Sequence, residues 1–147
     1  MQFFIDPDIK KARTLPSDFY TDKAFFEASK ENIFARSWQF LGGTEIADGL
    51  TPFCILPGFL DEPVVLAKTA DSAHCLSNVC THRGKLLVEA ACTASLIRCG
   101  YHGRRFSLDG EFLSMPEFDG VEDFPAEADN LRRVSSDELG GFHFASI

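Results

Sequence analysis

The chain has 147 residues, of which 45% are hydrophobic, and its formal net charge is -8 at pH 7. This length suits one globular core and is too short for two domains of ordinary size. The acidic balance disfavours nucleic acid as a partner, because the phosphates would be repelled. The opening residues lack the cationic and apolar pattern of a signal peptide, and no apolar run approaches the roughly 20 residues that cross a bilayer. We therefore expect a cytoplasmic protein with no membrane segment.

Residues 1–37 are expected to form an irregular arm followed by one helix. The first twenty residues mix charged side chains with Pro7 and Pro16. From Thr21, a candidate N-cap, the stretch TDKAFFEASKENIFARSW places apolar residues near helical spacing. We predict a helix over about residues 22–36.

Residues 38–147 have the pattern of an antiparallel β domain. Short apolar or alternating runs such as PFCILPG, PVVLAKT and GFHFASI are separated by Gly, Pro and Asp. The pair Asp109-Gly110 predicts a tight hairpin, because both central residues of such a turn tolerate positive φ. The acidic stretch at 117–129, EFDGVEDFPAEAD, is interpreted as a long solvated loop, with docking of a basic redox partner as the second interpretation.

Two mixed cysteine and histidine pairs stand in the segment NVCTHRGKLLVEAACTASLIRCGYHGRRF. Cys80 and His82 enclose one residue. Cys99 and His102 enclose two. Structural zinc would accept these ligand types, but zinc sites usually pair Cys with Cys and His with His, at wider spacing. A cluster with four cysteine ligands is disfavoured, because Arg83 stands where the plant-type pattern needs a cysteine. Two unrelated pairs, each beside glycines, would be a coincidence.

A [2Fe-2S] cluster of the Rieske type explains the mixing, because one of its irons has two thiolate ligands and the other has two imidazoles. If two loops hold the cluster from opposite sides, each loop supplies one residue to each iron. We expect Cys80 and Cys99 at the inner iron. We expect His82 and His102 at the outer iron, through neutral imidazole nitrogens. The residues expected around the cluster, with glycines that let the backbone approach the sulfides, are Arg83, Gly84, Gly100, Tyr101, Gly103 and Arg104.

The motifs CTHRG and CGYHGRRFSLDG resemble the Rieske domain at the N-terminus of ring-hydroxylating oxygenase alpha subunits. The flanking segments FYTDKAFFEASKENIFARSWQFLGG and SMPEFDGVEDFPAEADNLRRV are similar to those of the family, so the resemblance covers about residues 18–145. It implies an all-β fold with a short N-terminal helix. The β part would be a Rieske-type antiparallel β-sandwich with a cluster-binding subdomain of two loops, at about residues 75–110.

The resemblance also separates this chain from respiratory-chain Rieske proteins. Their two disulfide-forming cysteines are replaced here by Lys85 and Tyr101, and a serine that bonds a sulfide there is replaced by Arg104. Fewer hydrogen bonds to sulfur imply a reduction potential toward the low end of the Rieske range of about -150 to +300 mV. Arg104 is also a departure within the oxygenase family, many members of which have Trp at this position.

The implied function is electron transfer through a low-potential cluster. Electrons would come from a ferredoxin or flavin reductase and pass to a mononuclear iron in a C-terminal oxygenase catalytic domain that this chain does not contain. The chain alone would be an electron-transfer module of an oxidoreductase, and the full-length protein is expected to form a homo-oligomer. The alternatives are a stand-alone Rieske ferredoxin, which the N-terminal helix argues against, and a zinc-stabilised binding module.

The remaining histidines and cysteines are not expected to bind metal. His74 and His143 lie in different predicted strands, and His143 alternates with two phenylalanines, so we expect it to face away from them toward solvent. The cysteines expected to be small buried packing residues are Cys54, Cys75 and Cys92. The strand-like ending GGFHFASI suggests that Ile147 is a boundary ahead of the removed oxygenase domain.

Overall fold

The computed structural model describes residues 3–147. Contacts between residues divide the chain into two compact units, Met1–Arg36 and Ser37–Ile147. The second unit contains all the β-strands found within residues 3–147 and all four predicted cluster ligands. The predicted all-β fold with a short N-terminal helical part is confirmed.

The N-terminal unit has two short α-helices where one was predicted over 22–36. Helix α1 is Ser17–Thr21 and helix α2 is Lys23–Asn32, followed by the 3-10 turn η1 at Phe34–Arg36. The break falls at Asp22, whose extended backbone caps α2 and whose side chain accepts a hydrogen bond from the Ala24 N–H at 2.8 Å. Within residues 3–147, no helix combines the length and apolar character needed to cross a bilayer.

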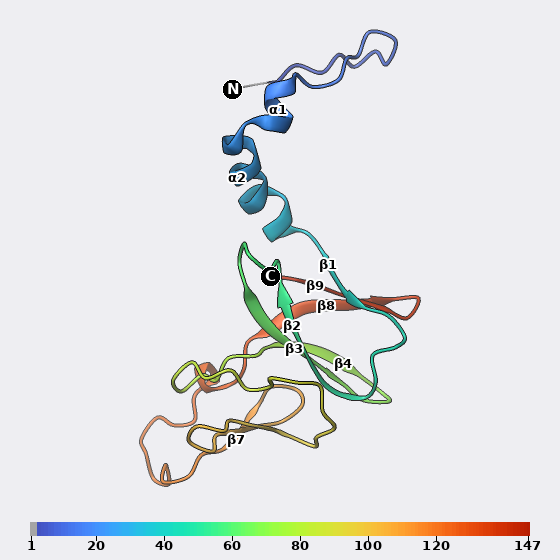
Figure 1. Ribbon diagram of the computed structural model, residues 1–147. Coiled ribbons are helices and arrows are strands. Elements are labelled where there is room, and N and C mark those ends of the chain that lie inside the picture. Colours follow the sequence, from blue (N-terminus) through green and yellow to red (C-terminus); the bar gives the residue numbers. More distant parts are fainter. Residues whose placement is uncertain (1–2) are drawn as a thin grey trace. The chain divides into compact units, whose positions relative to one another are not determined.

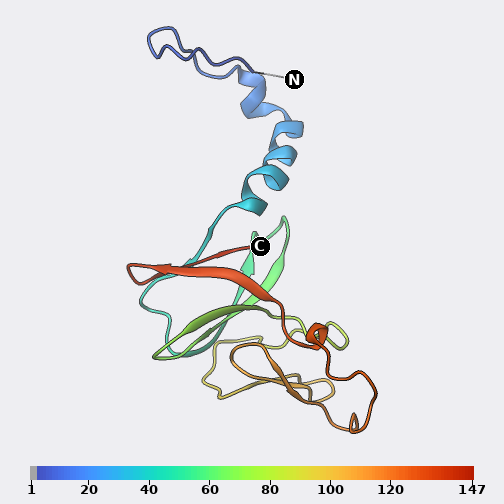
Figure 2. The ribbon, with the colours of Figure 1, turned by 180° about the vertical axis from the view of Figure 1, so that it is seen from behind.

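Two antiparallel sheets make up the unit Ser37–Ile147 (Figure 1). The strands of the six-stranded sheet, in spatial order, are β1 Gln39–Gly42, β9 Phe142–Ser146, β8 Arg133–Leu139, β4 Ala73–Ser77, β3 Glu62–Lys68 and β2 Gly49–Ile55. The strands of the small sheet are β5 Ile97–Arg98, β6 Arg105–Phe106 and β7 Phe112–Ser114. Figures 1 and 2 show from opposite sides that the chain between β4 and β8 gathers on one side of the large sheet.

Strand β3 is buried on both faces because a core lies on each side of it. Val65 and Ala67 belong to the core between the two sheets, while Val64 and Leu66 belong to the core on the opposite face. All four side chains are at most 1% exposed. Fully burying a valine or leucine contributes roughly 1.5–3 kcal/mol, so this strand anchors the domain. The core between the sheets also contains Leu50, Leu76, Cys80, Val88, Ile97, Cys99, Phe106 and Leu131.

The turn between β6 and β7 holds the small sheet against the large one. It is the predicted hairpin, but only Gly110 has positive φ, at 89°. A Cβ at Gly110 would lie 2.9 Å from the Leu76 side chain of β4, so glycine is required for this close approach. The Gly110 carbonyl accepts from the Leu131 N–H at 2.8 Å, and Asp109 contacts His74 of β4 at 2.9 Å. These contacts position the base of the cluster loops.

Candidate metal centre

The first loop follows β4 and carries Cys80 and His82. Its backbone closes through two hydrogen bonds: the Cys80 N–H donates to the Lys85 carbonyl at 2.9 Å, and the Gly84 N–H donates to the Cys80 carbonyl at 3.0 Å. Gly84 has a φ of 67°, in the left-handed region that favours glycine. The turn therefore depends on Gly84 and places Cys80 at its start.

The second loop joins β5 to β6 and repeats this backbone pattern. The Cys99 N–H donates to the Arg104 carbonyl at 2.8 Å, and the Gly103 N–H donates to the Cys99 carbonyl at 3.1 Å. Gly103 has a φ of 76°, and a Cβ there would also lie 3.3 Å from the Pro116 ring. Each cysteine thus starts the same turn, with its histidine two residues later in the first loop and three in the second.

Asn78 connects the two ends of the first loop from inside the domain, a role that the sequence alone does not predict. The residue is 1% exposed. Its side-chain amide donates to the Val88 carbonyl at 2.8 Å and accepts from the Val88 N–H at 2.9 Å. This pair of bonds joins the beginning and the end of the loop. A single asparagine after an apolar run carries no periodic signal, so only the fold reveals its role.

The predicted ligands meet as a sulfur pair and an imidazole pair. Cys80 and Cys99 are 3% and 2% exposed and belong to the core between the sheets, with their thiols close enough to interact. His82 and His102 are half-buried, with ring centroids 4.9 Å apart. Tyr101, which is exposed, stacks on His102 at 3.7 Å. The sulfurs therefore lie at the inner end of the site and the imidazoles at its outer end.

Backbone N–H groups of both loops point at the cysteine sulfurs. Burial alone raises the pKa of Cys99, but the N–H groups of Tyr101 and His102 oppose it, and the pKa is lowered overall. The Tyr101 nitrogen lies 3.5 Å from the Cys99 sulfur. Burial raises the pKa of the neighbouring Cys80, although the N–H of His82 acts in the other direction. Each turn therefore offers amide donors to a thiolate, as an anionic metal centre requires.

The His82 imidazole is favoured in its neutral form. Desolvation lowers the pKa of His82, and the nearby positive charges of His102, Arg83 and Arg104 lower it further. Neutral imidazole is the form that binds metal ions. The electrostatics of the loops thus support ligand roles for both donor types.

A buried imidazole nitrogen without a hydrogen-bond partner indicates that a metal fits between these residues. Within residues 3–147, Nδ1 of His102 is buried and has no hydrogen-bond partner. An unpaired buried polar atom is costly, and coordination to a metal would satisfy it. No group of three His, Cys, Asp or Glu side chains in the described chain is placed to hold one ion. A sulfur pair beside an imidazole pair is the donor set of a centre with two metals, each taking two protein ligands.

The residues expected to surround the cluster differ in burial. Arg83, Gly84 and Gly100 are exposed, and Gly100 does not have positive φ. Arg104 is only 2% exposed, and Thr81 and Asp129 hydrogen-bond its guanidinium. The motif alone predicts that Arg104 lies near the site, but it does not reveal these two partners.

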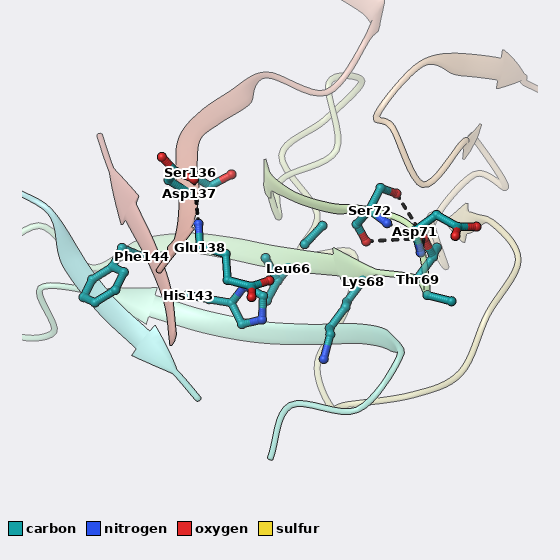
Figure 3. Close-up of a pocket in the computed structure, with 12 residues that line it drawn as sticks. Leu66, Lys68, Thr69, Asp71, Ser72, Ser136, Asp137, Glu138, His143 and Phe144 are labelled. Atoms are coloured by element: carbon teal, nitrogen blue, oxygen red, sulfur yellow. Dashed lines mark hydrogen bonds between the residues drawn. The ribbon is translucent and has the colours of Figure 1, made fainter. Parts of the chain in front are cut away.

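The expectation that His143 faces solvent is wrong. His143 is 3% exposed and points inward from β9, whereas the neighbouring Phe142 is 52% exposed. His143 lines a cavity of about 350 Å³. Figure 3 shows Lys68 and Glu138 at the wall of the same cavity. None of the four predicted ligands lines this cavity. The alternation along the strand was correct, but the buried and exposed faces are reversed.

Of the three cysteines expected to be buried packing residues, only one is buried. Cys75 is 1% exposed, and burial raises its pKa to about 12. Cys54 and Cys92, by contrast, are exposed, so the packing prediction is wrong for them. His74 contacts Asp109, as described for the β6–β7 turn.

Residues 57–125 match the family model of the Rieske [2Fe-2S] domain. Together with the two sheets and the paired loops, this match defines the class: the chain contains a Rieske iron-sulfur domain. The carnitine monooxygenase oxygenase subunit of Escherichia coli (strain K12) is 31% identical over 140 residues, covering 94% of this chain and 37% of that subunit. Over almost its whole length, the chain is similar to the N-terminal portion of the oxygenase subunits of Rieske oxygenases.

Two further relatives extend the comparison. A crystal structure of the quaternary ammonium Rieske monooxygenase CntA has a TM-score of 0.76 and 32% identity, covering 92% of this chain and 40% of that one. The large oxygenase component of the naphthalene 1,2-dioxygenase system of Pseudomonas aeruginosa is 36% identical over 96 residues, covering 65% of this chain and 21% of that protein. The chain therefore spans well under half the length of the relatives that it matches.

Proposed function

We propose that Cys80, His82, Cys99 and His102 hold a Rieske [2Fe-2S] cluster, and that this chain is the electron-transfer part of a larger Rieske oxygenase. When bound, such a cluster supplies one-electron oxidation and reduction. One observation carries the proposal: two loops with the same backbone turn bring a sulfur pair and an imidazole pair together.

The two ends of the site have different tasks. Cys80 and Cys99 hold the inner iron in a core that excludes water, and amide donors of the loops stabilise the thiolates. His82 and His102 hold the outer iron where the side chains are half-buried. The exposed ring of Tyr101 covers one face of His102 and contributes to the surface that a redox partner would meet.

In the whole protein, residues 38–147 act as the Rieske domain, residues 1–37 as an arm and helix, and a C-terminal catalytic domain contributes the mononuclear iron. A ferredoxin or flavin reductase donates the electrons. The limited coverage of the relatives supports a further domain. Electron transfer between subunits is described for a quaternary ammonium Rieske monooxygenase of 32% identity, which supports a homo-oligomer. All five cysteines are free, in agreement with a cytoplasmic location.

Relatives named for carnitine and for naphthalene both match this part of the chain. The Rieske domain therefore serves oxygenases of different substrates, and substrate choice belongs to the remainder of the protein.

The test is the iron and acid-labile sulfide content of the anaerobically purified protein, with absorption and EPR spectra after reduction with dithionite. We expect two irons and two sulfides per chain, as the cluster formula requires. Replacing Cys99→Ser or His102→Cys should abolish or alter the spectrum. Cys92→Ser and His74→Gln remove the same residue types away from the site and should leave it unchanged.

A colourless protein with one zinc and no sulfide would refute the proposal. An unaltered spectrum in His102→Cys would remove that histidine from the ligand set. Adding ascorbate before dithionite determines whether the potential is low, because ascorbate alone would reduce a high-potential cluster, whereas a low-potential cluster would need dithionite.

A further inference from the structure

Arg104 is a buried cation that joins the two ligand loops. Its side chain is 3% exposed. The guanidinium donates through Nη1 to the Thr81 hydroxyl at 2.6 Å and through Nη2 to Oδ1 of Asp129 at 2.7 Å. The Thr81 hydroxyl donates in turn to the Asp129 carbonyl at 2.8 Å. Because Thr81 lies between the first cysteine and histidine of the motif, these bonds connect both loops to the segment 117–129.

The surroundings of Arg104 leave its charge poorly screened. The guanidinium carbon lies 5.0 Å from the centroid of the Phe112 ring and 5.4 Å from that of Phe124. The two rings contact each other at 4.9 Å. Nε of Arg104 is buried and has no hydrogen-bond partner among the described residues. In such a setting the effective dielectric is low, so a unit charge acts over a longer distance than it would in water.

Asp129 is fixed independently of Arg104. Its second carboxylate oxygen accepts a hydrogen bond from the Ala126 N–H at 2.8 Å, and its side chain is 21% exposed. The carboxylate therefore stays in place when the arginine is altered. The Arg104–Asp129 pair thus consists of one deeply buried cation and one anchored, partly exposed anion.

We propose that the Arg104–Asp129 pair positions the two ligand loops and sets the reduction potential of the cluster. This inference rests on the cluster being held as proposed above. Reduction adds one negative charge to the centre, so the guanidinium favours the reduced form and the carboxylate favours the oxidised form. Removal of either partner leaves the other without its counter-charge. The potential consequently responds to the two partners with opposite sign.

The test compares reduction potentials, measured by EPR-monitored titration, for four variants of the cluster-loaded protein. Arg104→Gln should lower the potential and Asp129→Asn should raise it, each by about tenfold in the reduction equilibrium constant, or ~59 mV for one electron. The double variant should return close to the wild-type value. Arg104→Lys keeps the charge but loses the two-point contact, so it should retain the potential and lower the melting temperature.

Arg105→Gln is the matched control, because Arg105 is the next residue and is exposed. Solvent screens the charge of Arg105. The reduction potential of the cluster should therefore shift much less in Arg105→Gln than in Arg104→Gln. A purely structural role would loosen the loops in both single variants and move both potentials in the same direction. That result, or shifts no larger than the control's, would overturn the inference.

The outcome is distinguishable from failure of the proposed function. Wild-type protein without iron and sulfide refutes the cluster itself. A normal wild-type cluster with unshifted potentials refutes only the role of the charge pair. If Arg104→Gln does not fold, the sign of the shift in Asp129→Asn still decides, because a fall or no change in potential contradicts the inference.

Discussion

Replacing Asn78→Ala should strongly destabilise the domain. The alanine leaves both the N–H and the carbonyl of Val88 without the partners they have at 2.9 and 2.8 Å. Val88 is 7% exposed, so water does not replace these bonds easily. Each buried polar group left unpaired costs about 1–3 kcal/mol, which gives about 2–6 kcal/mol for the pair. A domain has about 5–15 kcal/mol in total, so this is a large fraction.

Urea unfolding followed by circular dichroism measures this loss, with wild type and variants compared at equal iron content. Asn32→Ala is the control, since its side chain bonds the Ala28 carbonyl at 2.8 Å on an exposed helix and should cost less than about 0.5 kcal/mol. The cluster should also be released faster from Asn78→Ala, because the two hydrogen bonds that connect the ends of the first loop are lost. Equal stability of Asn78→Ala and the control would show that the hydrogen bonds between Asn78 and Val88 do not hold the loop in place.

Three further predictions concern thiols, glycines and pH. Iodoacetamide should alkylate Cys54 and Cys92 of the native, cluster-loaded protein and spare the three buried cysteines, as peptide mass spectrometry can show; equal labelling of all five would contradict the burial. Gly103→Ala should cost about 1–2 kcal/mol in unfolding free energy because its φ is 76°, whereas Gly100→Ala, in open space without positive φ, should cost little. Asp129 has a pKa lowered first by a backbone N–H donor and then by its arginine partner, against the opposing effect of burial. Its stabilisation is therefore present above the ordinary value of 3.8 and lost as the pH falls below it, so Asp129→Asn should flatten the acid limb of the melting-temperature profile.

The cluster motif could be identified from sequence because its information is local. Each cysteine and histidine pair lies within one turn, beside glycines whose positive φ the structure requires at 84 and 103. The alternating apolar runs likewise predicted strands, because a half-buried strand repeats every two residues. Both kinds of signal depend on neighbours in the chain.

The features that were missed depend on partners far apart in sequence. Arg104 and Asp129 are 25 residues apart, and Thr81 and Asp129 are 48 apart, so no periodicity connects them. The orientation of His143 failed for a different reason. Alternation assigns side chains to two faces but does not say which face is buried, and on β9 the aromatic residue Phe142 is the exposed one.

The double burial of β3 makes the domain one cooperative block. Because adjacent residues of this strand pack into cores on opposite faces, neither core can open while the other stays closed. Amide protons at Val64–Ala67 should then exchange with deuterium only through global unfolding. Iron loading at the loops would slow the exchange of these amides too, since a ligand that binds only the folded state raises the free energy of global unfolding.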